Sequence, residues 1–412
     1  MKRFNHHILK LILICIITMH SFSSDGQVFD FLEGKDKVSI PFEFKHNFLL
    51  IEVRFQNVVP LTLMFDTGAE HTILFDKVYT ELFNIPYDRK IKIYGADLSK
   101  QLFANVARNV RMAIGGIANI PRDIVVLDED YYHLKEITGI NIDGIISPSF
   151  FNNMVIKIDF KKNLITLYNP VAFKAPKTFE ESEVEFFKRK PYINTTAKLQ
   201  DGTTLNLKLL IDSGAALPLL LHANSHSSLE IPENVISGKL GVGLGGAIEG
   251  FMGRIESLNF SKFKFSEIIT SFQDLSDSKI AQNEINRNGL MGTQILSRFT
   301  VIFNPITEKV YFKPRKNLKK AFKFDKSGMI IYAFGPHLND FIVQGIIPNS
   351  AAEMAGIKIG DKIKRVGIIS TKLMKLGDLL VKFQKRPGKK VKLKIQRGED
   401  IIHKTLILKE LL

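Results

Sequence analysis

Two aspartates stand in nearly identical surroundings, and their residue type and setting suit acid–base chemistry. Asp66 follows the apolar run Leu61–Phe65 and precedes Thr-Gly-Ala, whereas Asp212 follows Leu207–Ile211 and precedes Ser-Gly-Ala. A carboxylate at the end of an apolar strand is costly to bury unless it is hydrogen-bonded or shares a proton. One such motif also describes an ordinary turn, but two copies in matching surroundings indicate a functional pair.

A second pair of motifs repeats at nearly the same spacing. Asp143-Gly-Ile-Ile, followed by two strand-like segments, matches Asn288-Gly-Leu-Met and the segments after it. Two landmarks that repeat in register predict two homologous lobes, each carrying one aspartate. Two carboxylates that face each other across a pseudo-twofold axis would hold one proton between them, making one a base and the other an acid.

The elements that position these motifs are predicted to be mainly strands. Apolar, β-branched and aromatic runs alternate with turn residues, and Asp201-Gly202 is typical of a hairpin turn. We expect strands at 38–44, 49–55 and 61–65, and short helices at 75–82 and around Ile295.

With these four motifs the chain resembles the aspartic peptidases of the pepsin and retropepsin clan over roughly residues 30–314. The resemblance implies a mainly β fold of two pepsin-like, or tandem retropepsin-like, β-barrel lobes. It also implies an aspartic-type endopeptidase in which Asp66 and Asp212 hold a water between them. One carboxylate would draw a proton from the water while the other donates to the peptide carbonyl. This chemistry needs no covalent intermediate, metal or organic cofactor.

The same resemblance gives supporting roles to the residues around the two aspartates. The two hydroxyls are expected to cross-link the active loops, and the two glycines to let the backbones approach closely. These four residues are Thr67, Gly68, Ser213 and Gly214. Gly144 and Gly289 are expected in the loop that crosses behind each aspartate.

Three positions depart from the pattern of relatives. Ser147 stands where relatives often have glycine, which puts the tightness of the first loop in question. Ala69 and Ala215 replace the Ser or Thr of pepsins, and we expect that neither donates a hydrogen bond to the ionised dyad. We therefore hypothesise activity at weakly acidic to near-neutral pH.

A flap over the cleft is expected in each lobe. In lobe one the candidates are Tyr94 and Gly95, although Tyr94 is also compatible with a core or rim tyrosine. In lobe two the glycine-rich segment 241–246 lacks the Lys-Ser/Thr ending of a phosphate-binding loop, which favours a mobile hairpin.

The other polar residues near the motifs are interpreted without catalytic roles. His71 has no second histidine or carboxylate cluster at ligand spacing, which argues against a metal or a triad. Glu70 is expected at the rim of the cleft or in a salt bridge. Asp97 and Asp159 are interpreted as turn residues.

The pattern changes after Ser327. The segment Pro348–Asp361 resembles a signature of bacterial PDZ domains, over about residues 322–412. The resemblance implies a small α+β domain that captures an extended peptide, or a protein C-terminus, beside an exposed strand. The candidate carboxylate-binding residues are Gly328, Met329 and Ile330. The alternative is a scaffold that packs against the peptidase and stabilises it.

Charge is concentrated in this last quarter. Residues 315–412 hold 22 Lys and Arg against 8 Asp and Glu, whereas the whole chain has a net charge of +15. The lysines are scattered, which is typical of a solvated surface, although an acidic ligand would also fit. No nucleic-acid-binding motif accompanies them, so we expect no nucleic-acid partner.

The amino terminus has the form of a secretory signal peptide. Basic residues flank the apolar run 11–17, and small polar residues follow it at 21–24. A lipoprotein anchor through Cys15 is disfavoured by the bulky Ile14. We therefore expect an extracytoplasmic protein, periplasmic or secreted, with no membrane span after signal removal. The predicted division is 1–24 signal peptide, 28–170 lobe one, 171–318 lobe two and 319–412 PDZ domain.

Two functions of different classes fit this organisation. The first is the endopeptidase, expected as a monomer because one chain carries both aspartates, with peptides or proteins as substrates. The second is a non-catalytic envelope protein that uses the cleft and the PDZ domain to hold peptides. Intact Asp66 and Asp212 favour the first.

Overall fold

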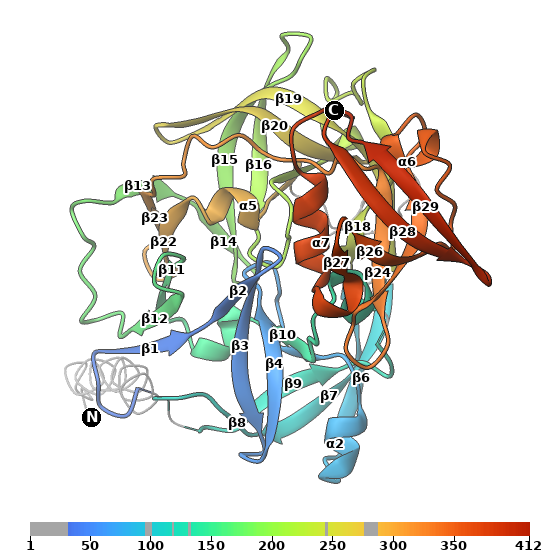
Figure 1. Cartoon of the computed structure of the whole chain (residues 1–412). Helices are drawn as coiled ribbons and strands as arrows, with labels where there is room; N and C mark the ends of the chain where they lie inside the picture. The colour runs from blue at the N-terminus through green and yellow to red at the C-terminus, as the bar shows by residue number, and fades with distance from the viewer. Residues whose placement is uncertain (1–31, 95–100, 118, 131–132, 244–245, 276–286) are drawn as a thin grey trace, which may run out of the picture.

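A computed structural model describes residues 32–94, 101–117, 119–130, 133–243, 246–275 and 287–412 (Figure 1). The fold is mainly β, as predicted. The predicted signal peptide, Gly95 and Asp97 lie outside the described residues. Within the described ranges, no helix has the length and apolar character needed to cross a membrane.

The first sheet carries Asp66 at the end of β4. Its strand order is β2-β3-β4-β10-β5-β9-β7-β6, with β8 beside β3. The strands are β2 (Glu43–Lys45), β3 (Phe48–Phe55), β4 (Val59–Phe65), β5 (Ile73–Leu74), β6 (Tyr87–Tyr94), β7 (Gln101–Val110), β8 (Met112–Ala113), β9 (Arg122–Val126) and β10 (Gly144–Ile146). The first part of β4 alternates between buried and more exposed residues, and its last three residues, Leu63 to Phe65, are all buried. The strands predicted at 49–55 and 61–65 are confirmed.

The second sheet carries Asp212 at the end of β16 and repeats this arrangement. Its order is β14-β15-β16-β21-β17-β20-β19-β18. The strands are β14 (Glu185–Phe187), β15 (Lys190–Lys198), β16 (Thr204–Ile211), β17 (Leu219–His222), β18 (Ile236–Gly243), β19 (Gly246–Phe260), β20 (Phe263–Gln273) and β21 (Gly289–Met291). The predicted turn joins β15 to β16, where Thr203 N–H donates to Asp201 Oδ1 at 2.8 Å.

A third sheet joins the two halves. Its order is β1-β12-β11-β22-β23-β13, and its central pair β11–β22 is antiparallel, with Ile158 opposite Val301. The strands are β1 (Lys37–Pro41), β11 (Val155–Asp159), β12 (Leu164–Tyr168), β13 (Glu180–Glu183), β22 (Phe299–Asn304) and β23 (Lys309–Pro314). The single strand predicted at 38–44 is therefore wrong, because the chain leaves this sheet after Pro41 and enters the first sheet at β2.

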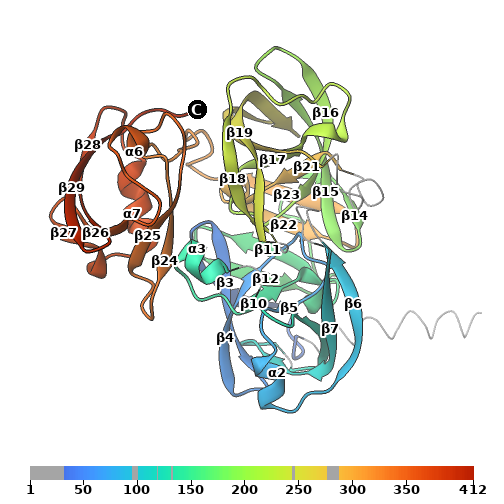
Figure 2. The same cartoon turned by 90° about the vertical axis from the view of Figure 1, so that its right-hand side faces the viewer.

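The C-terminal residues form a fourth sheet beside the other three (Figure 2). Its order is β24-β25-β26-β28-β29, with β27 beside β26. Its elements are β24 (Met329–Phe334), β25 (Asp340–Ile346), α6 (Ala351–Met354), β26 (Lys362–Val366), β27 (Ile369–Ser370), η3 (Thr371–Leu373), α7 (Leu376–Phe383), β28 (Lys390–Arg397) and β29 (Asp400–Ile407). This sheet has its own hydrophobic core, whereas one continuous core runs through both aspartate-bearing halves.

The remaining helices of the described residues are short. They are α2 (Val78–Leu82), α3 (Leu134–Thr138), η1 (Pro148–Phe151), η2 (Ala223–Ser225) and α5 (Thr293–Leu296). The helix predicted around Ile295 is confirmed as α5. The helix predicted at 75–82 begins later, because Asp76 Oδ1 accepts from Val78 N–H and forms a turn before α2.

Candidate active site

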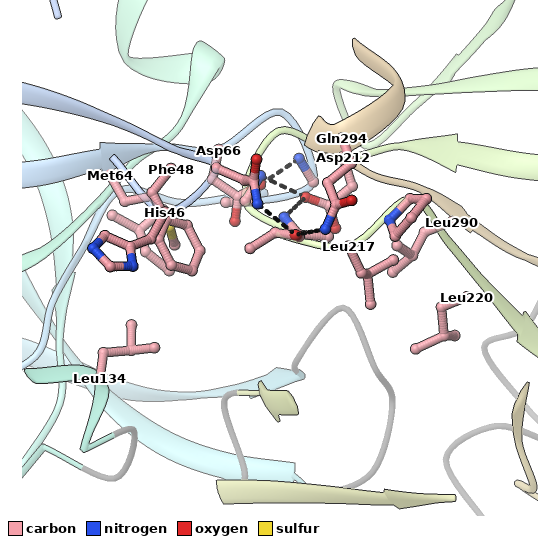
Figure 3. Close-up of a pocket in the computed structure, with 18 of the residues that line it drawn as sticks. His46, Phe48, Met64, Asp66, Leu134, Asp212, Leu217, Leu220, Leu290 and Gln294 are labelled. Carbon is pink, nitrogen blue, oxygen red and sulfur yellow. Dashed lines mark hydrogen bonds between the residues drawn. The ribbon is translucent and has the colours of Figure 1, made fainter. Parts of the chain in front are cut away.

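Asp66 and Asp212 lie next to each other at the floor of a cleft of about 1050 Å³ between the two halves (Figure 3). Each aspartate is fixed from behind by a backbone hydrogen bond. Asp66 N–H donates to Ile146 O at 3.1 Å, and Asp212 N–H donates to Met291 O at 3.0 Å. The two residues are 8% and 2% exposed. The structure therefore brings together the two predicted catalytic residues in a buried, matched setting.

Backbone amides hold one oxygen of each carboxylate. Gly68 N–H donates to Asp66 Oδ1 at 2.7 Å, and Gly214 N–H donates to Asp212 Oδ1 at the same distance. Ala215 N–H also donates to Asp212 Oδ1, at 3.0 Å. The expectation that Ala215 cannot donate to the dyad is therefore wrong, since its backbone does so even though its methyl cannot.

The two glycines of the active loops allow the carboxyls to meet. A Cβ added to Gly68 would lie 2.7 Å from Asp212 Oδ2, and a Cβ added to Gly214 would lie 2.4 Å from Asp66 Cγ. Real Cβ atoms do not approach other atoms so closely. Each loop thus needs glycine because the aspartate of the other loop occupies the space that a side chain would take.

The two carboxyls are electrostatically coupled. Burial raises the pKa of Asp66 well above its usual range, and the neighbouring charge of Asp212 and the hydrogen bond between them raise it further. Burial also raises the pKa of Asp212. The hydrogen bond from Asp66, the backbone amides and the positive charge of Arg287 lower this pKa, but the effect of burial is larger. Because two like charges this close repel each other, the two carboxyls favour a state in which they share one proton.

Two hydroxyls cross-link the active loops, as the resemblance implies. Ser213 N–H donates to Thr67 Oγ1 at 2.9 Å, and Thr67 N–H donates to Ser213 Oγ at 3.0 Å. Each hydroxyl also donates to the other half, Thr67 Oγ1 to Ile211 O at 2.7 Å and Ser213 Oγ to Phe65 O at 2.9 Å. These four buried bonds fix the position of one loop against the other.

The strand behind each aspartate needs glycine. Gly144 and Gly289 begin β10 and β21, each of which runs parallel to the strand that ends at an aspartate. A Cβ at Gly144 would lie 2.2 Å from Ile73 O, and one at Gly289 would lie 2.0 Å from Leu220 O. Both residues were expected in a loop, whereas they lie in short strands.

Ser147 does not loosen the first half. Its hydroxyl donates to Ala69 O at 2.7 Å, and its N–H donates to Thr72 Oγ1 at 3.2 Å. Gly292 has the equivalent place in the second half, where a Cβ would lie 2.1 Å from Leu217 O. The first loop is thus closed by side-chain hydrogen bonds and the second by close backbone packing.

The described flap residues lie at strand ends. Tyr94 closes the β6–β7 hairpin opposite Gln101 and lines the cleft, while Gly95 lies outside the described residues. The hairpin of β18 and β19 contains the segment 241–246, of which 244–245 lie outside the described residues. Tyr94 thus lines the cleft, and its role as a flap residue stays a prediction.

Two polar residues of the peptidase-like part, His71 and Asp159, make ordinary contacts. His71 Nε2 lies 3.9 Å from Glu70 Oε1 at the rim of the cleft, and burial lowers the pKa of His71. Asp159 Oδ1 accepts from Lys161 N–H at 3.0 Å, as in an ordinary turn. Neither His71 nor Asp159 contacts the dyad through a described hydrogen bond.

The C-terminal sheet contributes a wall of the cleft that the sequence did not reveal. A Cβ at Gly377 of α7 would lie 2.5 Å from His46 Cε1, in the turn between β2 and β3. Other residues along the cleft are Leu380 and Val381 of α7 and Gln384, which follows the last residue of this helix. Their spacing puts them on one helix face. The sequence contains this face but gives no indication of the surface that it meets.

The predicted carboxylate loop of this sheet is engaged internally. Gly328 N–H donates to Asp325 Oδ1 at 3.1 Å, and Met329 N–H donates to Ser327 Oγ at 3.1 Å. Ile330 pairs with Gly345 on β25. A nearby carboxylate and a hydroxyl thus already accept from two of the amides, and a carboxylate-binding role for these residues stays a prediction.

Comparisons with known proteins find likeness in fold alone. No protein-family model and no curated protein matches the chain in sequence. The aspartic proteinase from Irpex lacteus superposes with a TM-score of 0.42 at 10% identity, covering 69% of this chain and 99% of that chain. Basic 7S globulin from soybean does so with a TM-score of 0.42 at 7% identity, covering 68% and 95%. Similarity this remote transfers no activity to this chain.

Proposed function

We propose that this protein is an aspartic-type endopeptidase, a hydrolase that cleaves peptide bonds with a water activated by Asp66 and Asp212. The proposal is carried by one observation, the pair of buried carboxyls joined by a hydrogen bond at the floor of a large cleft. A dyad that holds one proton offers a general base and a general acid at the same pH.

In the proposed reaction, a water held between the carboxyls loses a proton to the ionised one as its oxygen attacks the carbonyl carbon of the peptide. The protonated carboxyl gives its proton to the carbonyl oxygen, which yields a neutral tetrahedral diol. In the collapse of the diol, the carboxyl that took the proton of the water gives it to the amide nitrogen, and the C–N bond breaks. A hydroxyl of the diol passes its proton to the other carboxylate. The dyad again holds one proton, and no bond forms between protein and substrate.

The surrounding residues hold this geometry in place. The amides of Gly68 and Gly214 fix one oxygen of each carboxylate, which leaves the other oxygens to face the water. The cross-link of Thr67 and Ser213 keeps the two loops in register. Orientation of this kind supports catalysis because the reacting groups are already aligned before the substrate arrives.

We also propose that the dyad works at weakly acidic to near-neutral pH. Burial raises the pKa of both carboxyls, and the methyl groups of Ala69 and Ala215 supply no hydrogen bond to the ionised form. The amide of Ala215 and the charge of Arg287 oppose this effect at Asp212. A pH–rate profile that peaks only at strongly acidic pH would contradict this part of the proposal.

For the C-terminal sheet, the contacts favour the role of a scaffold and cleft wall. Helix α7 lies against His46, and α3 of the first half packs against β24, the edge strand where a peptide would be added. A Cβ at Gly139, directly after α3, would lie 3.5 Å from Ala333 Cβ. The chain itself thus covers part of the edge that a PDZ-like peptide ligand would need.

The predicted location outside the cytoplasm remains part of the proposal. It is supported by the charge and hydropathy pattern of residues 1–24. Fractionation of cells that express the full chain, followed by N-terminal sequencing of the mature protein, tests it. A protein that keeps Met1 and stays in the cytoplasm contradicts this location.

The test of the activity uses an unfolded, cysteine-free protein substrate in water enriched in ¹⁸O. We expect internal cleavage, and each new carboxyl terminus should carry ¹⁸O from the attacking water. Release of single terminal residues instead would contradict an endopeptidase. Tight binding of the substrate without any cleavage would favour the alternative, a non-catalytic peptide-binding protein.

A further inference from the structure

The two halves present equivalent turns to the cleft. The turn between β2 and β3 has positive φ at His46 and Asn47, and the turn between β14 and β15 has positive φ at Lys188 and Arg189. In each case the residue after the turn pairs with the residue before it, Phe48 with Lys45 and Lys190 with Phe187. Phe48 and Lys190 therefore occupy equivalent positions in the two halves.

A second equivalent pair follows from the strands behind the aspartates. Ile142 precedes Asp143-Gly144, and Arg287 precedes Asn288-Gly289. The side chain of Asp143 accepts from Thr62 N–H, just as Asn288 Oδ1 accepts from Lys208 N–H, both at 2.8 Å. The two pairs of positions thus differ in the same way, since each is apolar in the first half and cationic in the second.

The first half surrounds these positions with apolar side chains. Phe48 and Ile142 belong to one hydrophobic cluster with Met64 and Leu50, and Phe48 and Met64 line the cleft. Phe48 and Met64 lie on the same side of the dyad in Figure 3. This side of the cleft suits an apolar side chain of a bound peptide, because burying it removes apolar surface from water.

The second half is polar and positively charged at the equivalent place. Lys190 and Arg287 both line the cleft, together with Tyr192, to which Arg287 is hydrogen-bonded. Lys208 also lines it but is already paired with Glu185 Oε2 at 2.6 Å. Lys188 lines the cleft as well. These cations on one wall, with Asp212 close to Arg287, give this side a field that attracts anionic groups.

Lys190 is the cation best placed to bind such a group. It is partly buried, and no carboxylate in the described part of the chain lies within ion-pair distance of its Nζ. Burial and the nearby charge of Arg287 lower the pKa of Lys190, whereas Glu70 across the cleft raises it. A lysine that is partly desolvated beside an arginine is costly in the unbound protein, and an anionic ligand would offset this cost.

We propose that the second half of the cleft binds an acidic side chain, Asp or Glu, of the peptide substrate through Lys190 and Arg287, while the first half binds an apolar side chain beside Phe48. This inference rests on the proposed endopeptidase activity and names its substrate class. The two halves of the cleft thus bind different types of substrate side chain on the two sides of the cleaved bond. Lys190 and Arg287 act as specificity residues and take no part in the proton transfers.

The test compares capped peptides that carry Glu, Gln or Lys at one position within three residues of the cleaved bond. With both ends capped, a side chain supplies the only carboxylate near the bond. We expect kcat/KM for the Glu peptide to exceed that for the Gln peptide by about tenfold at one position on one side of the bond. The preference should fall at about 1 M salt, which screens charges beyond about 3 Å.

Two substitutions and a matched control assign the preference to its residue. Lys190→Met keeps the aliphatic chain and should bring kcat/KM for the Glu peptide close to that for the Gln peptide. Lys190→Glu should give the highest kcat/KM with the Lys peptide. Arg189→Met removes one positive charge from the same turn, but Arg189 is outside the described lining of the cleft. It should keep the preference of the parent. Circular dichroism verifies that each variant is folded.

The outcomes separate this inference from the proposed function. Cleavage with equal kcat/KM for Glu and Gln peptides at every position overturns the acidic subsite and leaves the endopeptidase intact. Loss of the preference in Arg189→Met as well as in Lys190→Met also overturns it, because net charge alone would then explain the effect. If the parent cleaves no peptide, fluorescence anisotropy of the same peptides still decides, since equal affinity for Glu and Gln peptides refutes the subsite.

Discussion

Removal of one hydroxyl should uncouple the two active loops. Thr67→Val keeps the shape of the side chain but deletes the oxygen that accepts from Ser213 N–H at 2.9 Å and donates to Ile211 O at 2.7 Å. Thr67→Ser is the matched control, because it deletes only a methyl group and keeps both hydrogen bonds. The pair of variants therefore separates the effect of the cross-link from the effect of packing.

The size of the effect follows from the burial of the groups left behind. Ser213 is fully buried, so its unpaired N–H costs about 1–3 kcal/mol, and the lost bond to Ile211 O costs about 1 kcal/mol more. Thr67→Val should thus lose about 2–4 kcal/mol of unfolding free energy. Thr67→Ser should lose about 1 kcal/mol, the value of one buried methyl group.

Urea unfolding is followed by far-ultraviolet circular dichroism, since the chain has no tryptophan whose fluorescence could report it. Peptide cleavage is measured on the same preparations. Because a displacement of about 1 Å can cost about a hundredfold in rate, kcat of Thr67→Val should fall by about that factor while Thr67→Ser stays close to the parent. Equal losses in the two variants, or a Thr67→Val protein as stable and active as the parent, would refute the role of the cross-link.

Three further predictions concern other parts of the molecule. Gly289→Ala should abolish folding because its Cβ would lie 2.0 Å from a carbonyl oxygen, whereas Gly115→Ala, with no atom within 4 Å, should express as a folded protein. Since burial raises the pKa of Asp66, the stability that its carboxyl contributes is present below about pH 4 and is lost as pH rises through the folded-state pKa. Calorimetry should therefore show Asp66→Asn gaining stability relative to the parent as the pH rises above about 4, and a constant difference would contradict this. Arg397→Met should lower the urea midpoint, because it removes the guanidinium that contacts the Asp361 carboxylate through Nε at 2.7 Å, and an unchanged midpoint would disprove this.

The sequence predicted the centre of the site because the site is built from a repeat. The two Asp-(Thr/Ser)-Gly-Ala motifs and the two later glycine motifs fall at matching positions, and the structure places them around one dyad. Strand and turn patterns near these motifs were also informative. The role of Ser147 was not predictable, because its bonds to Ala69 and Thr72 depend on tertiary contacts.

Features formed between distant segments were missed for the same reason. The sheet shared by the two halves pairs β11 with β22, which the hydropathy of either strand alone does not indicate. The wall formed by α7 depends on how the C-terminal sheet packs against His46. Lys190 and Arg287 were passed over because a charged residue in a single sequence is usually solvated, and only comparison of equivalent positions in the two halves distinguishes them.

The central claim is that Asp66 and Asp212 together activate water for peptide hydrolysis. Its most direct test follows cleavage of an unfolded protein by the mature parent, by Asp66→Asn and by Asp212→Asn across about pH 3 to 8, a range that spans the ordinary and raised pKa values of carboxyls. The account predicts cleavage by the parent and loss of cleavage in both variants, with folded circular dichroism in all three. Cleavage that survives in either variant, or a folded parent that cleaves nothing at any pH, would contradict it.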